Sequence, residues 1–111
     1  MSITFETTGP VLVVDLLGRL DSANAAEVEG ALLERVTATT GPVVLDLVRL
    51  DYISSAGLRV VLVVAKRMKQ AGRPLVLCGL QPNIRDVFEI SGFLGILDVV
   101  AKRAEALTKL R

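Results

Sequence analysis

The chain has 111 residues, enough to bury one hydrophobic core, so we expect a single domain spanning residues 1–111. Its 13 basic and 12 acidic side chains give a formal net charge of +1, which excludes a strong overall field for nucleic acid or an anionic membrane. The absence of histidine and the single cysteine exclude the usual zinc, haem and iron–sulfur ligand sets, an internal disulfide and a histidine-based catalytic pair. We therefore expect no cofactor and no metal.

The sequence does not predict export or membrane insertion. Residues 1–6 lack the basic region and following apolar stretch that are typical of a signal peptide. No apolar run approaches the ~20 residues needed to span a bilayer. The one cysteine, Cys78, lies in an apolar run and is typical of a buried free thiol. We expect a cytoplasmic protein.

The first half of the chain predicts a hairpin, a helix and a central strand. Alternating residues predict an edge strand over residues 3–7, and a run rich in β-branched residues predicts a buried strand over residues 11–17. The glycine-proline turn between them favours a hairpin. Asp21 and the serine after it offer N-cap oxygens for a helix whose apolar residues recur at helical spacing over residues 25–36. A second apolar run predicts a strand over residues 43–48.

The second half alternates between helical and strand patterns. We predict helices over residues 56–70 and 83–90, strands over 74–79 and 96–99, and a terminal helix from residue 101 onward. An alternation of this kind after an initial hairpin indicates an α/β fold. We expect a mixed, mostly parallel sheet of about 4–5 strands with about four helices.

The most informative stretch joins the central strand to the second helix: Asp51-Tyr52-Ile53-Ser54-Ser55-Ala56-Gly57-Leu58-Arg59. Serine is a favoured N-cap, and the N-terminus of a helix also has free amides and a positive pole that can hold a phosphate. A serine here can be a cap, a nucleophile or a phosphorylation switch. The missing Cβ of Gly57 would leave room for the phosphate, and Asp46 and Asp51 are expected to fix the turn by hydrogen bonds.

Two of the possible chemistries at this turn are disfavoured. The motif is not Gly-x-Ser-x-Gly and the chain has no histidine base, so a nucleophilic serine lacks its activating group. The turn has one glycine and no Gly-Lys-Ser/Thr, which disfavours a P-loop. The cap and the switch both stay open on this evidence.

The second helix predicts a surface for a partner. On a helical wheel its buried face carries Leu58, Val61, Ala65 and Met68, with Leu62 and Val64 at the edges. The opposite arc is basic, yet it contains Val63, with Val60 at its margin, between Arg59 and Arg67. An apolar centre flanked by arginine is typical of an interface. The alternative is an ordinary surface with one exposed valine.

Three segments resemble the landmarks of the STAS domain family, to which bacterial anti-sigma factor antagonists belong. Residues 53–59 are similar to the serine signature of that family, residues 18–21 (Gly-Arg-Leu-Asp) to a second landmark, and residues 83–92 to a third. The order of the predicted elements also matches, so the resemblance covers essentially the whole chain. It implies a STAS-type single domain.

The resemblance also implies a function. In this family the serine two positions before the motif glycine, here Ser55, is phosphorylated by an anti-sigma factor that is a serine kinase with a histidine-kinase-type ATPase fold. The unphosphorylated protein binds the kinase and releases a sigma factor, and a PP2C-type phosphatase restores it. The family often has aspartate where this chain has Ser54, and Ser or Thr where it has Ala56. Asp21 corresponds to the region that faces the kinase, and an N-cap is its alternative role.

We therefore predict a regulatory binding protein, not an enzyme and not a direct ligand of nucleic acid. One alternative is an accessory subunit of an ABC-type lipid transport complex, which would bind the transporter ATPase without phosphorylation. Another is a domain that takes a nucleotide near the serine helix. The predicted partner-binding residues are Asp21, Ser54, Ser55, Ala56, Gly57, Arg59, Val60, Val63 and Arg67.

Overall fold

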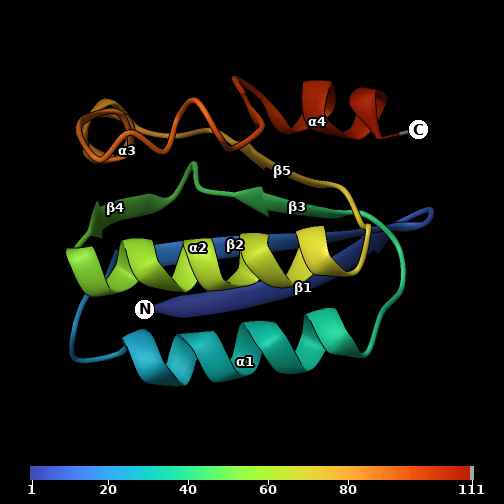
Figure 1. Ribbon diagram of the computed structural model, residues 1–111, viewed down its shortest axis with the longest axis horizontal. Helices are drawn as coiled ribbons and strands as arrows, with labels where there is room; N and C mark the ends of the chain where they lie inside the picture. The colour runs from blue at the N-terminus through green and yellow to red at the C-terminus, as the bar shows by residue number, and fades with distance from the viewer. Residues whose placement is uncertain (111) are drawn as a thin grey trace.

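The chain begins with a β-hairpin whose turn contains Gly9 in the left-handed region, at φ 59°. In the computed structural model, which describes residues 1–110, β1 spans Ser2–Thr8 and β2 spans Val11–Leu20. The whole of β1 pairs antiparallel with residues 11–17 of β2. β2 is the longer and more deeply buried of the two strands. Its residues contribute to both hydrophobic cores of the domain, which different helices cover (Figure 1).

Strands and helices alternate after the hairpin. Within residues 1–110 the sheet has six strands in the order β1-β2-β3-β5-β6, with β4 pairing with the last residues of β2, and every pairing after the hairpin is parallel. The elements that follow the hairpin are α1 (Ala25–Thr37), β3 (Val43–Asp46), β4 (Leu50–Ile53), α2 (Ser55–Gln70), β5 (Leu75–Cys78), α3 (Pro82–Ile90), β6 (Val99–Val100) and α4 (Arg103–Lys109).

The predicted α/β fold with an N-terminal hairpin, a mixed and mostly parallel sheet and four helices is confirmed for residues 1–110. The strand predicted over residues 43–48 is wrong in its extent. It ends at Asp46, whose Oδ1 accepts a hydrogen bond of 3.0 Å from the backbone N–H of Val48 and so fixes a bend. A separate strand, β4, follows that bend. The last strand is Val99–Val100 and lies later than predicted.

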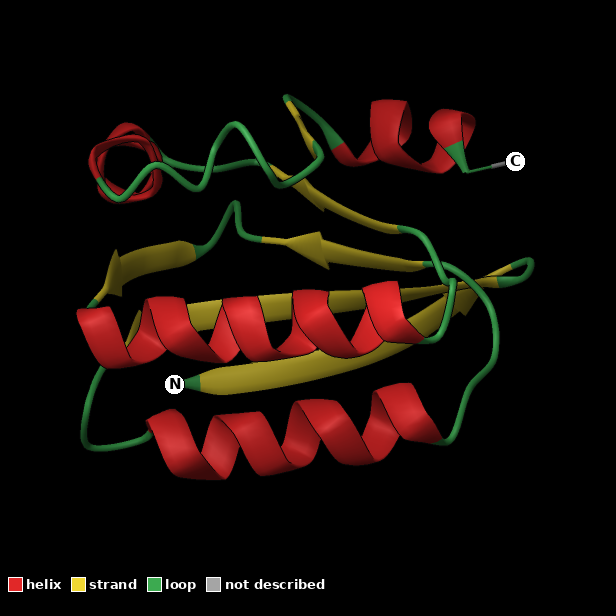
Figure 2. Cartoon of the chain, viewed as in Figure 1, coloured by secondary structure: helices red, strands yellow, loops and turns green. Residues whose placement is uncertain are grey.

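Alternate residues of β2 point to opposite faces of the sheet and create two cores. Leu12, Val14 and Leu16 join the larger core, which α1 and α2 cover. Val11 and Val13 join the smaller core, to which α4 contributes Ala106. Figure 2 shows α1 and α2 on one side of the strands and α4 on the other. α3 packs beside β4 and adds two buried side chains to the larger core, Ile84 and Phe88.

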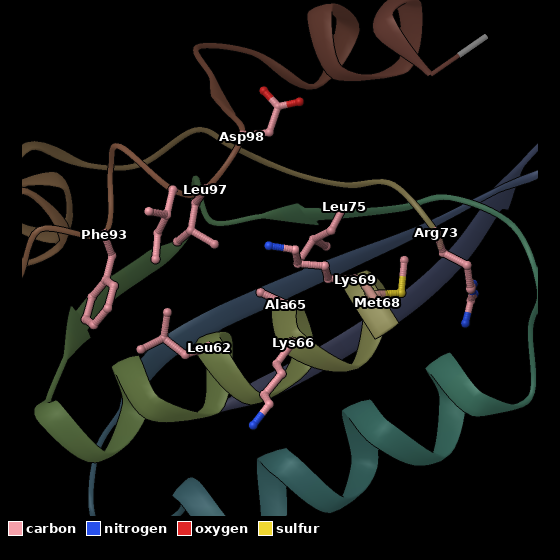
Figure 3. A pocket seen from close by; sticks show the side chains of 11 residues that line it. Leu62, Ala65, Lys66, Met68, Lys69, Arg73, Leu75, Phe93, Leu97 and Asp98 are labelled. Atoms are coloured by element: carbon pink, nitrogen blue, oxygen red, sulfur yellow. The ribbon is translucent and has the colours of Figure 1, made fainter. Parts of the chain in front are cut away.

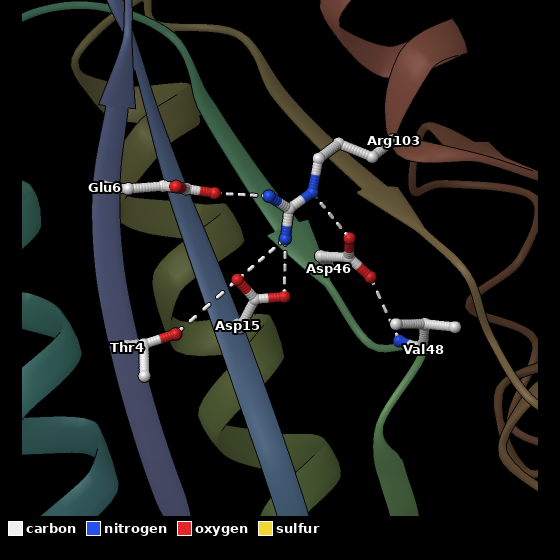
Figure 4. Close-up of polar contacts among 6 residues, drawn as sticks. All are labelled: Thr4, Glu6, Asp15, Asp46, Val48 and Arg103. Atoms are coloured by element: carbon white, nitrogen blue, oxygen red, sulfur yellow. Dashed lines mark hydrogen bonds and ion pairs between the residues drawn. The ribbon is translucent and has the colours of Figure 1, made fainter.

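Arg103 fastens α4 to three strands (Figure 4). Its Nε donates a 2.8 Å hydrogen bond to Asp46 on β3, its second terminal nitrogen lies 2.6 and 2.7 Å from the carboxylate oxygens of Asp15 on β2, and the first pairs with Glu6 on β1. Burial acts to lower the pKa of the guanidinium, but the hydrogen bonds with Asp15 and Asp46 outweigh it and raise that pKa. The group therefore stays charged.

Cys78 lies close to this ion cluster, in the smaller core. It is a free and fully buried thiol, as the sequence predicts. Burial, with a further contribution from the negative charge of Asp46, raises its pKa to about 12. Because thiolate is the reactive form, the residue is inert at neutral pH and acts as a small apolar side chain.

Replacing Arg103 by alanine should leave the carboxylate of Asp46, whose residue is 5% exposed, without its cationic partner. We expect Arg103→Ala to lower the free energy of unfolding by about 3 kcal/mol, measured by denaturant titration. Lys109→Ala is the matched control on the same helix, because its exposed ion pair with Asp98 contributes less than about 1 kcal/mol. Equal losses in the two variants would contradict the role assigned to Arg103.

Candidate functional site at the N-terminus of α2

The N-terminus of α2 lies directly against the sheet because Gly57 has no side chain. A Cβ at this position would lie 2.7 Å from the carbonyl oxygen of Leu20 and 2.9 Å from Cγ1 of Ile53, closer than real contacts allow. Close packing of helix on strand therefore requires the glycine. The space that it provides is filled by Leu20 and Ile53, so the expectation that Gly57 leaves room for a phosphate is wrong.

Ser54 is the N-cap of α2. Its backbone is extended, and its Oγ accepts a hydrogen bond from the N–H of Gly57 at 3.2 Å. Its own N–H donates to the carbonyl oxygen of Leu20 at 3.0 Å, and its carbonyl accepts from Leu58 at 2.8 Å. These bonds tie Ser54 to the helix and to β2, so Ser54 fills the capping role that the sequence predicts for one of the two serines.

Ser55 differs from Ser54 in its exposure and in its hydrogen bonding, two properties that matter for modification. It is the first residue of α2, it is exposed, and its hydroxyl makes no hydrogen bond within residues 1–110. The first turn carries no acidic side chain, so the positive end of the helix dipole is not neutralised there. The structure thus separates two roles that the sequence leaves combined: Ser54 caps the helix, and Ser55 presents a free hydroxyl beside it.

Asp21 lies next to the serine turn because β2 and β4 are parallel neighbours in register. Leu20 pairs with Ile53, so the residues that follow them, Asp21 and Ser54, leave the same edge of the sheet together. The side chain of Asp21 is 30% exposed, with one oxygen 3.9 Å from Nε of Arg19.

Asp21 is not the N-cap of α1. Its Oδ1 accepts from the N–H of Ala23 at 3.0 Å inside a turn, and the helix begins only at Ala25. Asn24 occupies the cap position and holds the turn together, accepting from the N–H of Asp21 at 3.0 Å and donating to the carbonyl of Arg19 at 2.8 Å. The alternative role predicted for Asp21, the N-cap of α1, is therefore excluded.

The same register stacks Arg19 on Tyr52. The guanidinium carbon lies 4.1 Å from the ring centroid, and the two residues are direct partners across β2 and β4. This exposed cation–π pair borders Asp21 and was not predicted from the sequence. No local sequence pattern marks this pair, because the two residues come together only through strand pairing.

The outer surface of α2 differs from the predicted one at two residues. Arg59 and Arg67 are exposed, and Val63 and Ala56 are half-buried, so these four lie at the surface as predicted. Val60 does not, because α1 packs along that side of α2 and leaves the valine 2% exposed.

Gly57, also predicted as a partner contact, is likewise buried. The helical wheel identifies the centre of the buried face but not its width, which depends on the neighbouring helix.

The start of α3 holds the strand that leads into the serine turn. Asn83 donates a 2.8 Å hydrogen bond to the carbonyl of Asp51, and Gln81 donates to the carbonyl of Val48 at 3.0 Å and to Oδ1 of Asp51 at 3.4 Å. Asp51 therefore links β4 to the start of α3, and Asp46 bonds its own bend and Arg103. Neither aspartate bonds directly to the serine turn within residues 1–110, so the expectation that they fix that turn by hydrogen bonds is not confirmed.

Residues 1–110 contain no group of three or more metal-ligating side chains placed to hold an ion. In the same part of the chain, no helix combines the length and the apolar character that crossing a membrane requires.

The family model of the STAS domain matches residues 2–106. The chain belongs to the STAS domain family. Among its relatives, BtrV of Bordetella bronchiseptica, provisionally named an anti-sigma factor antagonist, is 51% identical over 106 residues, covering 96% of this chain and 91% of the relative. The anti-sigma F factor antagonist of Paenibacillus polymyxa is 29% identical over 111 residues, covering 99% and 95%.

The architecture is also that of a solved anti-sigma factor antagonist. The unphosphorylated form of SpoIIAA superposes with a TM-score of 0.83 at 21% identity, covering 99% of this chain and 96% of the other. The phosphorylated form of the Bacillus protein gives a TM-score of 0.76 at 21% identity, covering 99% and 100%. At these identities the likeness shows the STAS fold, and it confirms the fold predicted from the sequence.

The close packing of α2 against β2 and β4 predicts a large difference in stability between two glycine-to-alanine variants. Gly57→Ala should cost about 2 kcal/mol of unfolding free energy, because the added methyl group meets the backbone of Leu20. Gly30→Ala, in the exposed middle of α1, meets nothing within 4 Å and should stabilise the protein by about 0.5–1 kcal/mol. Denaturant titration of both variants checks this. If Gly57→Ala left the unfolding free energy unchanged, the close packing of α2 at this position would be contradicted.

Proposed function

We propose that this STAS domain is an anti-sigma factor antagonist controlled by phosphorylation at Ser55. Unphosphorylated, it binds an anti-sigma factor that is a serine kinase with a histidine-kinase-type ATPase fold, and a sigma factor is released. The kinase phosphorylates Ser55 and ends the complex, and a PP2C-type phosphatase restores the free hydroxyl. The observation that carries this proposal is the exposed, unbonded hydroxyl of Ser55 next to a separate capping serine. The names of the relatives support the same function.

The proposed partner-binding surface is built around the serine turn. Asp21, Ser54, Ser55 and Ala56 surround the N-terminus of α2, and the surface continues along the helix through an apolar residue flanked by two arginines, Arg59, Val63 and Arg67. The buried residues Gly57 and Val60 support it from beneath. Because arginines flank Val63, a partner with apolar and acidic groups fits this surface best.

Phosphorylation at Ser55 should change binding without changing the fold. Phosphate adds roughly −1.5 to −2 charges at pH 7. Because the hydroxyl of Ser55 has no hydrogen bond to lose within residues 1–110, and helix N-termini favour anions, the domain itself tolerates the group. The free energy of binding to the partner becomes less favourable instead, because added charge and bulk enter the contact surface. A loss of about 3 kcal/mol weakens binding roughly a hundredfold.

The test compares aspartate at the two adjacent serines. We expect Ser55→Asp to fold normally and to bind the kinase from the same cells about a hundredfold more weakly by calorimetry. Ser54→Asp adds the same charge one residue earlier, and aspartate is also a favoured N-cap, so we expect less than about a tenfold loss. Ser55→Ala should bind normally and accept no phosphate from the kinase and ATP.

Three outcomes would contradict the proposal. Ser55→Asp could bind the kinase as tightly as the parent protein, or it could unfold, which would make Ser55 a structural residue. The parent protein could also form a stable complex with a transporter ATPase while showing no modification by any sigma regulator, which would instead support an accessory subunit.

A further inference from the structure

A groove of about 590 Å³ runs beside the second half of α2, on the side away from α1 (Figure 3). It lies between the helix, the start of β5 and the segment of residues 91–98 that follows α3. Its size falls within the range of small-molecule sites, roughly 300–1,000 Å³. We propose that this groove binds a single-chain amphipathic carboxylate of the fatty-acid class, with the alkyl chain along the floor and the carboxylate at Lys69.

The floor of the groove is apolar and incompletely covered. Leu62 and Leu75 form one side and Phe93 and Leu97 the other, and all four are half-buried side chains that pack against the main core. Figure 3 shows the side chains of Leu62, Phe93 and Leu97 pointing into the space between α2 and the later segment. Ile96, at the rim, is 72% exposed. A continuous apolar surface of this kind indicates a binding site more often than isolated exposed residues do.

The charges around the groove favour an anion with a single charge. Lys69 extends across the groove in Figure 3 and has no ion-pair partner within residues 1–110. Asp98, the one acidic residue of the lining, is already paired with Lys109 at 2.7 Å. Arg73 donates to the backbone carbonyls of Val36 and Gly41, on the side of α1. Lys66 also lines the groove and has no ion-pair partner within residues 1–110, but its ammonium group points away from the groove in Figure 3. The uncompensated charge that faces the groove is therefore the ammonium group of Lys69.

A nucleotide fits the groove poorly. The groove lies at the C-terminal half of α2, where the negative end of the helix dipole disfavours every anion, and it disfavours a polyphosphate with several charges more than a carboxylate with one. The lining has neither a glycine-rich loop nor a helix N-terminus to hold phosphate oxygens. A long alkyl chain with one negative charge satisfies both the apolar floor and Lys69.

The proposed groove is separate from the serine site. Ser55 and Lys69 are fourteen residues apart on α2, roughly 21 Å along the helix axis. The ligand inference therefore does not rest on the phosphorylation switch, and either can fail without the other.

Binding of laurate to the full chain, followed by methyl NMR below the concentration at which laurate forms micelles, tests the proposal. We expect saturable shifts at Leu62, Leu97 and Ile96. Lys69→Gln should weaken laurate binding about fivefold, whereas Lys66→Gln should change it less than about twofold, because the ammonium group of Lys66 points away from the groove in Figure 3. Dodecanol, with the same chain and no charge, should bind more weakly and be insensitive to Lys69→Gln.

A second variant tests the position of the alkyl chain. Ala65 is half-buried and lines the groove, so Ala65→Phe should fill the space and weaken laurate binding more than tenfold. Circular dichroism and a cooperative denaturant unfolding transition would establish that this variant is folded, and Ala65→Leu offers a smaller change if it is not. Shifts that do not saturate, shifts located away from the groove, or laurate binding unaltered in a folded Ala65→Phe protein would each overturn the proposal.

Discussion

The close contact of Gly57 with Leu20 and Ile53 sets the position of every group at the candidate site. It allows the first turn of α2 to lie against the ends of β2 and β4. In that position the N–H of Gly57 reaches Oγ of Ser54, and the N–H of Ser54 reaches the carbonyl of Leu20. One serine is thereby used as the cap, and the next is left exposed on a rigid helix. Under the proposed switch, modification of a hydroxyl held this way changes the surface that a partner meets and leaves the fold of the domain unchanged.

A second constraint acts on the opposite face of the sheet. Glu6, Asp15 and Asp46 come from three adjacent strands, and the single guanidinium of Arg103 contacts all three. A buried cluster of this kind often adds little net stability over an apolar equivalent, because the charges must lose their water. What it supplies is a defined position for α4, since a charged group with three partners on the sheet cannot shift without leaving a buried carboxylate unpaired. The two faces thus have different chemistry: α1 and α2 cover the larger apolar core on one, and the other combines a smaller apolar core with the ion cluster of Arg103.

Much of this fold could be predicted from the sequence, and the errors have physical causes. Strand and helix periods identified the hairpin, α1, α2, α3, β5 and α4 because each has a local pattern. β4 was missed because residues 50–53 were assigned to the turn between the central strand and the second helix. Only two of its four residues are buried, and its pairing with β2 is non-local. Val60 was misplaced because a helical wheel does not include α1.

The non-local interactions of the structure could not be predicted at all. The pairs of Arg103 join residues that are 57 to 97 positions apart, and no spacing in the sequence marks them. The serine motif itself was visible, and the family resemblance pointed to Ser55, but the capping role of Ser54 became clear only from the hydrogen bonds. The most direct test of the central claim is phosphosite mass spectrometry on the protein isolated from its own cells during growth and stress, with fragments that distinguish the two serines. The account predicts a phosphate on Ser55 whose occupancy changes between the two conditions. A phosphate on Ser54, or no phosphate under either condition, would contradict it.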